Sequence, residues 1–299
     1  MHLGDEFRPS ATIVYPPFKK GRYLEEAFYE FYEQHGDRVY IPVFWTNLQT
    51  DSEFSSKKEQ LQETLTEWFA SFPPEQKYFA VVQHDDGIPF TIPKDTLVFG
   101  ACTGDIPLPL IYEDTDCTLE RIEQVPFNEK GYLASFMGTA THSVRTRMIE
   151  SKGPWFICTN DQWTNDVSKS KADKYIDIVK ESKFTLSPRG YGRSSFRFFE
   201  AFKLGSIPVY IYDDIEWLPY KELIDYTRFC ISININDLDQ LQSKLESIGE
   251  EDYTKYIESY HRIKHMFTMD GMNNYIVDTL SKGTPLALKL TPREGVSTV

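Results

Sequence analysis

The residues best suited to chemistry lie in a glycine-rich stretch that contains two arginines, Pro188–Arg193. One proline and two glycines prevent regular structure there, directly after a short β-type run at 184–187. Ser194 and Ser195 are favourable N-cap residues for a helix that continues to Leu204. Backbone N–H groups and the helix dipole favour an anion at such a place, and the arginines add positive charge. The pattern predicts a site for a phosphorylated ligand, and we expect that ligand to be a nucleotide.

A second cluster, His84, Asp85 and Asp86, follows a predicted strand in the first half of the chain. A neighbouring carboxylate can orient a histidine and raise its pKa, which suits general acid–base chemistry. The alternative is a tight Asp-Gly turn at Asp86 and Gly87, in which an aspartate bonds its own backbone. The sequence leaves both interpretations open.

Alternating strand and helix patterns supply the elements that must position these two clusters. Strand patterns run over 12–15, 38–43, 78–83, 96–101, 132–136, 155–158, 184–187, 207–212 and 228–233. Helix patterns run over 22–34, 56–72, 142–151, 172–182, 195–204, 238–248 and 252–280. Such alternation predicts mainly parallel sheets with helices on both faces, in two halves joined by a proline-rich acidic loop at 103–126. Because ligands of such sheets bind at the carboxyl ends of strands, we expect both clusters to meet in one cleft.

The composition excludes several classes of protein. A net charge of −13 over 299 residues would repel the phosphate backbone of a nucleic acid. No apolar stretch approaches the roughly 20 residues that a membrane helix needs, and the first residues show no signal-peptide pattern. Cys102, Cys117, Cys158 and Cys230 form no CxxC pair, and reduced thiols fit a cytosolic compartment. We therefore expect a soluble, cytoplasmic protein that binds no nucleic acid and has no integral membrane segment.

Five blocks of the sequence occur in an order that is typical of one family. They are Val39–Phe44, His84–Gly87, Asp105–Pro109, Tyr132–Gly138 with Arg145 after it, and Ser187–Val209. Together they resemble the exostosin-like glycosyltransferases (glycosyltransferase family 47), and the resemblance covers roughly residues 12–280. Asp86 departs from the pattern, because the family usually has an aromatic residue at that place.

The resemblance implies an α/β fold of the GT-B type, with two Rossmann-like domains facing a central cleft. Residues 1–128 would form the acceptor-binding domain, and residues 129–299 would form the nucleotide-sugar-binding domain. The last helices, near 252–280, would cross back to the first domain, as they do in many GT-B proteins.

The same resemblance implies roles for single residues in an inverting transfer from a UDP-sugar. Asp85 would be the catalytic base, with His84 as the alternative, and Asp86 would contact the acceptor. Arg189 would clamp the donor diphosphate and Glu200 would bind the ribose hydroxyls. The complete set of donor and nucleotide contacts would be Gly138, Arg145, Arg189, Gly190, Ser195, Arg197 and Glu200.

We expect neither a metal nor any other cofactor. Asp114-Thr115-Asp116 spells the Asp-x-Asp motif that holds a metal–nucleotide complex in GT-A glycosyltransferases. Here it lies in an acidic loop without the strand that should follow, and three-letter matches are common. In a GT-B enzyme, Arg189 and a helix dipole would do the electrostatic work of the metal.

The choice of substrate follows a narrower resemblance, to the soluble, anchorless enzymes of large DNA viruses and some microbes. UDP-xylose is our first choice of donor, and an oligosaccharide or glycoprotein glycan is the expected acceptor. Such a protein would work in the cytoplasm, which for a viral enzyme is that of the host cell, and a dimer is an open option. One alternative is a non-catalytic nucleotide-sugar-binding subunit of a glycosyltransferase complex. An NAD-type oxidoreductase fits the sequence less well than either of these, because Gly190-x-Gly192 lacks the third glycine of the dinucleotide-binding motif at the required spacing.

Overall fold

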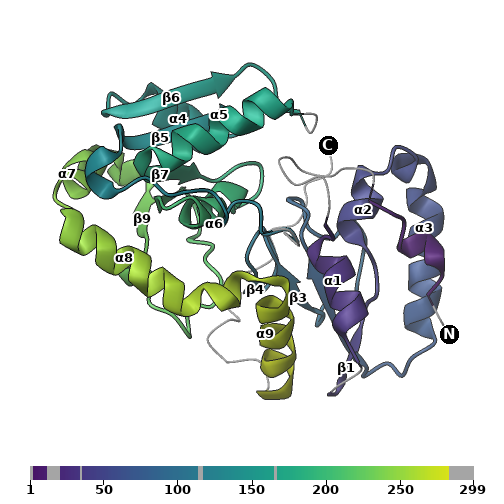
Figure 1. Cartoon of the computed structure of the whole chain (residues 1–299). Helices are drawn as coiled ribbons and strands as arrows, with labels where there is room; N and C mark the ends of the chain where they lie inside the picture. The colour runs from purple at the N-terminus through teal and green to yellow at the C-terminus, as the bar shows by residue number, and fades with distance from the viewer. Residues whose placement is uncertain (1–2, 12–20, 34–35, 114–116, 165–166, 283–299) are drawn as a thin grey trace.

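The computed structural model describes residues 3–11, 21–33, 36–113, 117–164 and 167–282. Within them the chain forms two α/β halves, each built on a parallel sheet (Figure 1). The strand expected at 12–15 and the Asp114–Asp116 motif lie outside the described residues.

The first sheet has the order β1-β2-β3-β4, and all its strands are parallel. Its strands are β1 (Arg38–Tyr40), β2 (Lys77–Val82), β3 (Leu97–Gly100) and β4 (Ile106–Pro107). Side chains of β2 alternate between two cores: Phe79 packs with α1 (Leu24–Phe31), and Ala80 packs with α3 (Phe54–Ala70). The sheet is therefore covered on both faces, as predicted. A short helix that the sequence did not predict, α2 (Trp45–Thr50), follows β1.

The second sheet has the order β6-β5-β7-β8-β9 and is also parallel throughout. Its strands are β5 (Tyr132–Thr139), β6 (Trp155–Asn160), β7 (Ser182–Pro188), β8 (Ile207–Tyr212) and β9 (Ile231–Asn234). Its helices are α4 (Ser143–Glu150), α5 (Lys169–Lys180), α6 (Phe196–Lys203) and α7 (Leu241–Glu246). Gly205 follows α6 with φ +68°, the left-handed conformation expected at a helix C-terminus.

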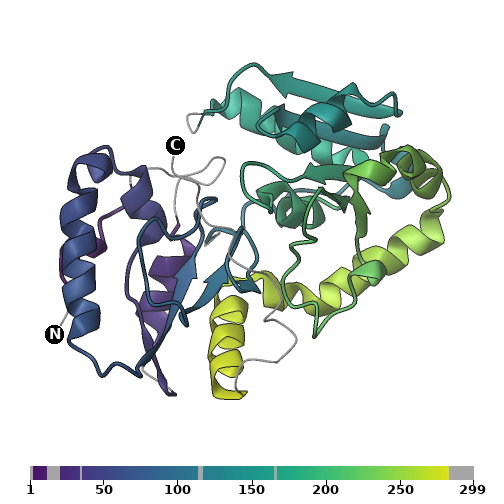
Figure 2. The same cartoon turned by 180° about the vertical axis from the view of Figure 1, so that it is seen from behind.

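The two last helices connect the halves. Helix α8 (Glu250–Ile263) packs beneath the second sheet, and α9 (Met269–Lys282) lies beside α1 in the first half (Figures 1 and 2). The side-chain amide of Asn273 in α9 donates a hydrogen bond to the carbonyl of Ala27 over 3.4 Å. The chain thus returns to the first half after completing the second.

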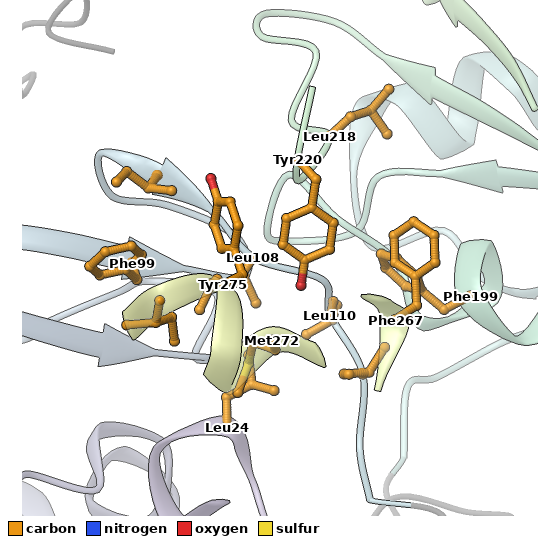
Figure 3. Close-up of a cluster of buried hydrophobic side chains, with 14 of the residues drawn as sticks. Leu24, Phe99, Leu108, Leu110, Phe199, Leu218, Tyr220, Phe267, Met272 and Tyr275 are labelled. Atoms are coloured by element: carbon orange, nitrogen blue, oxygen red, sulfur yellow. The ribbon is translucent and has the colours of Figure 1, made fainter. Parts of the chain in front are cut away.

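A shared hydrophobic core fixes the two halves to one another. Figure 3 shows Phe99, Leu108 and Leu110 of the first half gathered with side chains of the second half and of α9. The residues that meet them are Phe199, Leu218, Tyr220, Phe267, Met272 and Tyr275. Because this apolar surface would be exposed if the halves separated, its burial favours one arrangement of the two sheets.

Two parallel α/β units joined in this way form the GT-B architecture, and the predicted fold class is confirmed. The first sheet ends at Pro107 and the second begins at Tyr132. The boundary between residues 128 and 129 stays a prediction.

Candidate active site

A cleft of about 690 Å³ lies where loops from the carboxyl ends of both sheets face each other. This volume is in the range of small-molecule sites. Nine of the ten site residues predicted from the sequence line it: His84, Asp85, Asp86, Gly138, Arg145, Gly190, Ser195, Arg197 and Glu200. Arg189 is the exception. Residues that are up to 116 positions apart in the sequence therefore share one cavity.

Arg145 and Arg197 form the cationic part of the cleft, and both lie near the ring of Phe136. Their guanidinium carbons lie 6.0 Å and 5.0 Å from the centre of that ring. Arg145 donates to the carbonyls of Arg189 (3.0 Å) and Thr139 (3.1 Å), and Arg197 donates to the carbonyl of Met137 (2.8 Å). These carbonyls orient both groups without neutralising them. Among the described residues, neither arginine is in an ion pair with a carboxylate.

The proximity of these two arginines carries an electrostatic cost. Burial, and then the charge of Arg197, lower the pKa of Arg145. A bound anion would relieve both effects, since it would supply the missing negative charge. The arrangement is therefore a candidate anion site.

Two of the predicted glycines make room for these guanidinium groups. A methyl group on Gly138 would lie 2.2 Å from Nη2 of Arg197, and one on Gly190 would lie 2.8 Å from Nη2 of Arg145. Both distances are too short for real contacts, so each glycine allows one arginine to reach the cleft.

Arg189 has a different environment. Its guanidinium donates to Asp213 over 2.9 Å and to Asp214 over 3.0 Å, at the end of β8. Burial acts to raise the pKa of Asp214, but Arg193 and Arg189 oppose it and hold the value at about 2. The charge of Arg189 is thus compensated within the protein. Its predicted role as the diphosphate clamp is not tested by this geometry and stays a prediction.

Ser195 occupies the N-cap position of α6, as predicted, but its hydroxyl makes no capping hydrogen bond. The hydroxyl oxygen instead lies 3.5 Å from Nη1 of Arg197. The first turn of α6 therefore faces the cleft with backbone N–H groups that its own N-cap side chain does not occupy.

Glu200, which is only 8% exposed, lies at the cleft wall between two tyrosines. The hydroxyl of Tyr112 donates to one carboxylate oxygen, and the hydroxyl of Tyr175 donates to the other over 2.5 Å. No local sequence pattern indicated either of these tyrosine partners.

The opposite wall carries the acid–base cluster and also the alternative tight turn. The backbone N–H of Gly87 donates to the carbonyl of His84 over 3.0 Å, and Gly87 has φ +73°. The backbone N–H of Asp86 donates to Nδ1 of His84 over 3.2 Å, while the Asp86 side chain is exposed. The expected rise in the pKa of His84 is wrong. Burial lowers that pKa by more than Asp85 and Asp86 raise it, so the ring is held neutral.

Asp85 lies where the two walls of the cleft approach each other. The thiol of Cys102, which is 1% exposed, donates to Oδ1 of Asp85 over 3.2 Å. The backbone of Ser194, in the opposite half, also lies beside this thiol and favours its ionised form, although burial raises the pKa of Cys102. Oδ2 of Asp85 has no hydrogen-bond partner among the described residues. It is therefore available to a ligand.

Sequence reasoning missed part of the wall. Thr46, Gln49 and Thr50 line the cleft from α2, which was too short and too mixed in polarity to be predicted. Trp163, a lining residue that is half-exposed, follows β6. Its position, a tryptophan shortly after the predicted strand at 155–158, was the available sequence signal.

Within the described part of the chain, no group of three or more His, Cys, Asp or Glu side chains is arranged to hold a metal ion. In those ranges, too, no helix combines the length and the apolar character that crossing a bilayer requires.

Parts of this chain are similar to known proteins. Residues 101–248 match the Exostosin GT47 domain. The Exostosin-1 homolog of Caenorhabditis elegans is 26% identical over 184 residues, which are 53% of this chain and 48% of that protein. A probable glycosyltransferase of Arabidopsis thaliana is 28% identical over 104 residues, 34% of this chain and 22% of that protein. The chain thus spans half or less of the length of these relatives.

Two further proteins are similar to this chain, one over a shorter stretch of sequence and one only in part of its structure. A probable glucuronosyltransferase of Oryza sativa subsp. japonica is 34% identical over 86 residues, 29% of this chain and 20% of that protein. The crystal structure of TarM superimposes with a TM-score of 0.35 at 7% identity, over 68% of this chain and 54% of that one.

Proposed function

Because the chain belongs to the exostosin-like proteins of glycosyltransferase family 47, we propose that it transfers a sugar from a UDP-sugar to a hydroxyl of a glycan acceptor. The transfer inverts the anomeric carbon and requires no metal ion. One observation carries the proposal: two arginines that have no carboxylate partner among the described residues line the same cleft as the acid–base cluster. A cation pair suits a leaving diphosphate, and a carboxylate suits an attacking hydroxyl.

The donor occupies the second half. Arg145 and Arg197 bind the diphosphate and stabilise the negative charge that grows as UDP leaves. Gly138 and Gly190 allow this approach, and Glu200 accepts hydrogen bonds from the ribose. The acceptor and the walls of the cleft exclude water, which would otherwise hydrolyse the donor.

The acceptor occupies the first half. Its hydroxyl oxygen forms the new bond to the anomeric carbon while the bond from that carbon to the phosphate oxygen breaks. UDP leaves with the bonding electrons, and Oδ2 of Asp85 takes the hydroxyl proton. His84 is less suited to this step, because its Nδ1 accepts the N–H of Asp86 and its proton is therefore on Nε2. From there it can donate to an oxygen of the acceptor, and Asp86 is placed at the cleft edge to contact the acceptor too.

The choice among donors rests on the resemblance alone. UDP-xylose remains our first choice, with an oligosaccharide or glycoprotein glycan as the acceptor. A cytoplasmic location and a dimer are further expectations of the same kind. The alternative is a non-catalytic nucleotide-sugar-binding subunit, in which the donor half would function without the acceptor half.

The test combines binding with turnover. Thermal unfolding is measured with UDP, a panel of UDP-sugars, GDP and NADH, each with and without EDTA. A ligand at 100 times its dissociation constant stabilises the fold by about 2.7 kcal/mol. We expect stabilisation by UDP and by one UDP-sugar in both conditions, and transfer of that sugar to a glycan. Binding without transfer to any acceptor would favour the subunit, and stabilisation by NADH alone would overturn the proposal.

A further inference from the structure

Arg197 and Glu200 are three residues apart on α6, a spacing that normally brings opposite charges together on one helix face. Both line the cleft. Yet the ion pairs among the described residues include neither of them. Other contacts therefore hold the guanidinium of Arg197 and the carboxylate of Glu200 apart.

Neutral partners occupy each of these side chains. The Nε of Arg197 donates to the Met137 carbonyl over 2.8 Å, and the guanidinium lies over the ring of Phe136. Both oxygens of Glu200 accept tyrosine hydroxyls, as described above. A carbonyl, an aromatic face and two hydroxyls satisfy the groups without cancelling either charge.

The two tyrosines are themselves held in place. Tyr175 belongs to α5 and faces the cleft, and burial followed by the charge of Glu200 raises the pKa of its phenol, so it stays a donor. Tyr112 lies in the segment between the sheets, and its ring packs against Phe196 with centres 5.1 Å apart. One donor therefore comes from the second half and the other from the segment that joins the halves.

We propose that Tyr112 and Tyr175 are positioning residues that hold Glu200 away from Arg197. This inference rests on the proposed function. The separation of the two side chains leaves the charge of Arg197 available to the diphosphate. It also leaves one lone-pair direction on each oxygen of Glu200 for the two hydroxyls of a ribose. A site built in this way selects ribonucleotides over 2′-deoxyribonucleotides, since the deoxy sugar lacks one of the two hydroxyls that would use these lone-pair directions.

The first experiment measures the ratio of the dissociation constants of UDP and 2′-deoxy-UDP by calorimetry. We expect the wild-type protein to bind UDP about tenfold more tightly, the effect of one hydrogen bond to a charged group. In Tyr175→Phe, and in the double variant with Tyr112→Phe, the ratio should fall to about two. Tyr253→Phe is the matched control, because it removes a buried hydroxyl that donates to the Gly205 carbonyl over 2.6 Å, away from the cleft.

The second experiment uses pyrophosphate, which has no ribose. If Glu200 turns to Arg197 once its tyrosine partner is lost, Tyr175→Phe should weaken pyrophosphate binding about threefold or more. Adding Glu200→Gln to Tyr175→Phe should restore it, because glutamine cannot neutralise the arginine. A loss caused only by a damaged fold would not be rescued in this way.

The possible failures are distinguishable. If the wild-type protein binds no UDP, the proposed function fails and the inference fails with it. A second outcome is that the wild-type protein binds UDP and 2′-deoxy-UDP with nearly equal dissociation constants, or that its preference for UDP persists undiminished in Tyr175→Phe and in the double variant. In either case the proposed function stands and the positioning role is wrong. Unchanged pyrophosphate binding in Tyr175→Phe would also overturn the separation of Glu200 from Arg197.

Discussion

A methyl group on Gly192 would lie 2.4 Å from Oδ1 of Asp85, although the two residues belong to opposite halves of the molecule. The same methyl group would lie 2.5 Å from Sγ of Cys102. Gly192 is not among the glycines with positive φ, so close approach and not backbone conformation requires a glycine here. The two glycines of the loop thus differ in function: Gly190 accommodates Arg145, and Gly192 accommodates the candidate base.

Gly192→Ala should therefore separate the glycine-rich loop from the acid–base wall. We expect a loss of about 1–3 kcal/mol in the free energy of unfolding, as for other overpacked sites, and a transfer rate at least tenfold lower. Denaturant unfolding and initial-rate kinetics measure the two effects. Gly131→Ala is the control, since nothing lies within 4 Å of a methyl group there. Wild-type kinetics in Gly192→Ala would show that the contact with Asp85 is not needed.

Arg197 and Arg189 should behave differently when each is replaced by alanine. Arg197→Ala removes a cation that has no carboxylate partner in the described part of the chain, so we expect affinity for UDP to fall about 10- to 100-fold with little change in stability. Arg189→Ala breaks two ion pairs with Asp213 and Asp214, so we expect mainly a lower unfolding temperature. Calorimetry with UDP and thermal unfolding separate these effects. An equal loss of UDP affinity in Arg189→Ala would establish the diphosphate clamp that the sequence predicted.

Much of the fold was accessible from the sequence because its signals are local. The apolar stripe of α3 and the continuous apolar run of β8 each indicate burial without reference to the rest of the chain. Helix α2 escaped prediction because six residues of mixed polarity span fewer than two helical turns, too few for a repeating apolar pattern to be recognised. The pairing of α9 with α1 depends on contacts across almost the whole chain, so the resemblance suggested a return of the last helices but no local pattern indicated α1 as the partner.

The resemblance named residues of the cleft but not their interactions. Arg145 and Glu200 were named in advance by the family pattern, and both line the cleft from α4 and α6, the helices that follow β5 and β7. The partners of Glu200 could not be named, because Tyr112 and Tyr175 lie 88 and 25 residues from it. The pKa of His84 was misjudged for a related reason: sequence shows the neighbouring carboxylates but not the burial that outweighs them.

Asp85→Asn should abolish proton transfer while leaving the donor site intact. We expect kcat to fall about 10²- to 10⁴-fold, the usual range for loss of a general base, with UDP affinity unchanged within about twofold. His84→Gln should have a smaller effect, because its Nδ1 already accepts a backbone N–H. Steady-state kinetics and UDP titration measure both variants. If His84→Gln loses as much kcat as Asp85→Asn, the roles of the two residues must be exchanged.

Removal of metal should leave transfer unchanged. The proposed mechanism gives the charge of the leaving diphosphate to Arg145 and Arg197, so EDTA and added Mg²⁺ should alter the rate by less than about twofold. Initial rates after dialysis against EDTA, with and without Mg²⁺, measure this directly. A rate that collapses in EDTA and returns with Mg²⁺ would contradict the metal-independent mechanism.

A buried carboxylate behind the acceptor wall should make stability depend on pH. Glu25 is fully buried, and its Oε1 accepts the backbone N–H of Thr46 (3.2 Å), the Thr46 hydroxyl (2.7 Å) and the N–H of Gln83 (2.9 Å). Oε2 has no partner among the described residues. Burial raises the pKa of Glu25 to about 7, although these hydrogen bonds oppose it. Glu25 thus joins α1 to α2 and to the strand end that precedes His84.

The sign of the effect follows from the raised pKa. As pH increases from the ordinary value of 4.5 to about 7, Glu25 ionises in the unfolded chain before it ionises in the folded one, so the free energy of unfolding falls. The full loss is on the order of 3 kcal/mol. Glu25→Gln should remove this dependence: relative to wild type, the variant should gain stability between about pH 5 and about pH 8. Urea unfolding at both pH values measures it, with the exposed Glu59→Gln as control. A constant difference between Glu25→Gln and wild type at the two pH values would show that Glu25 does not titrate in this range.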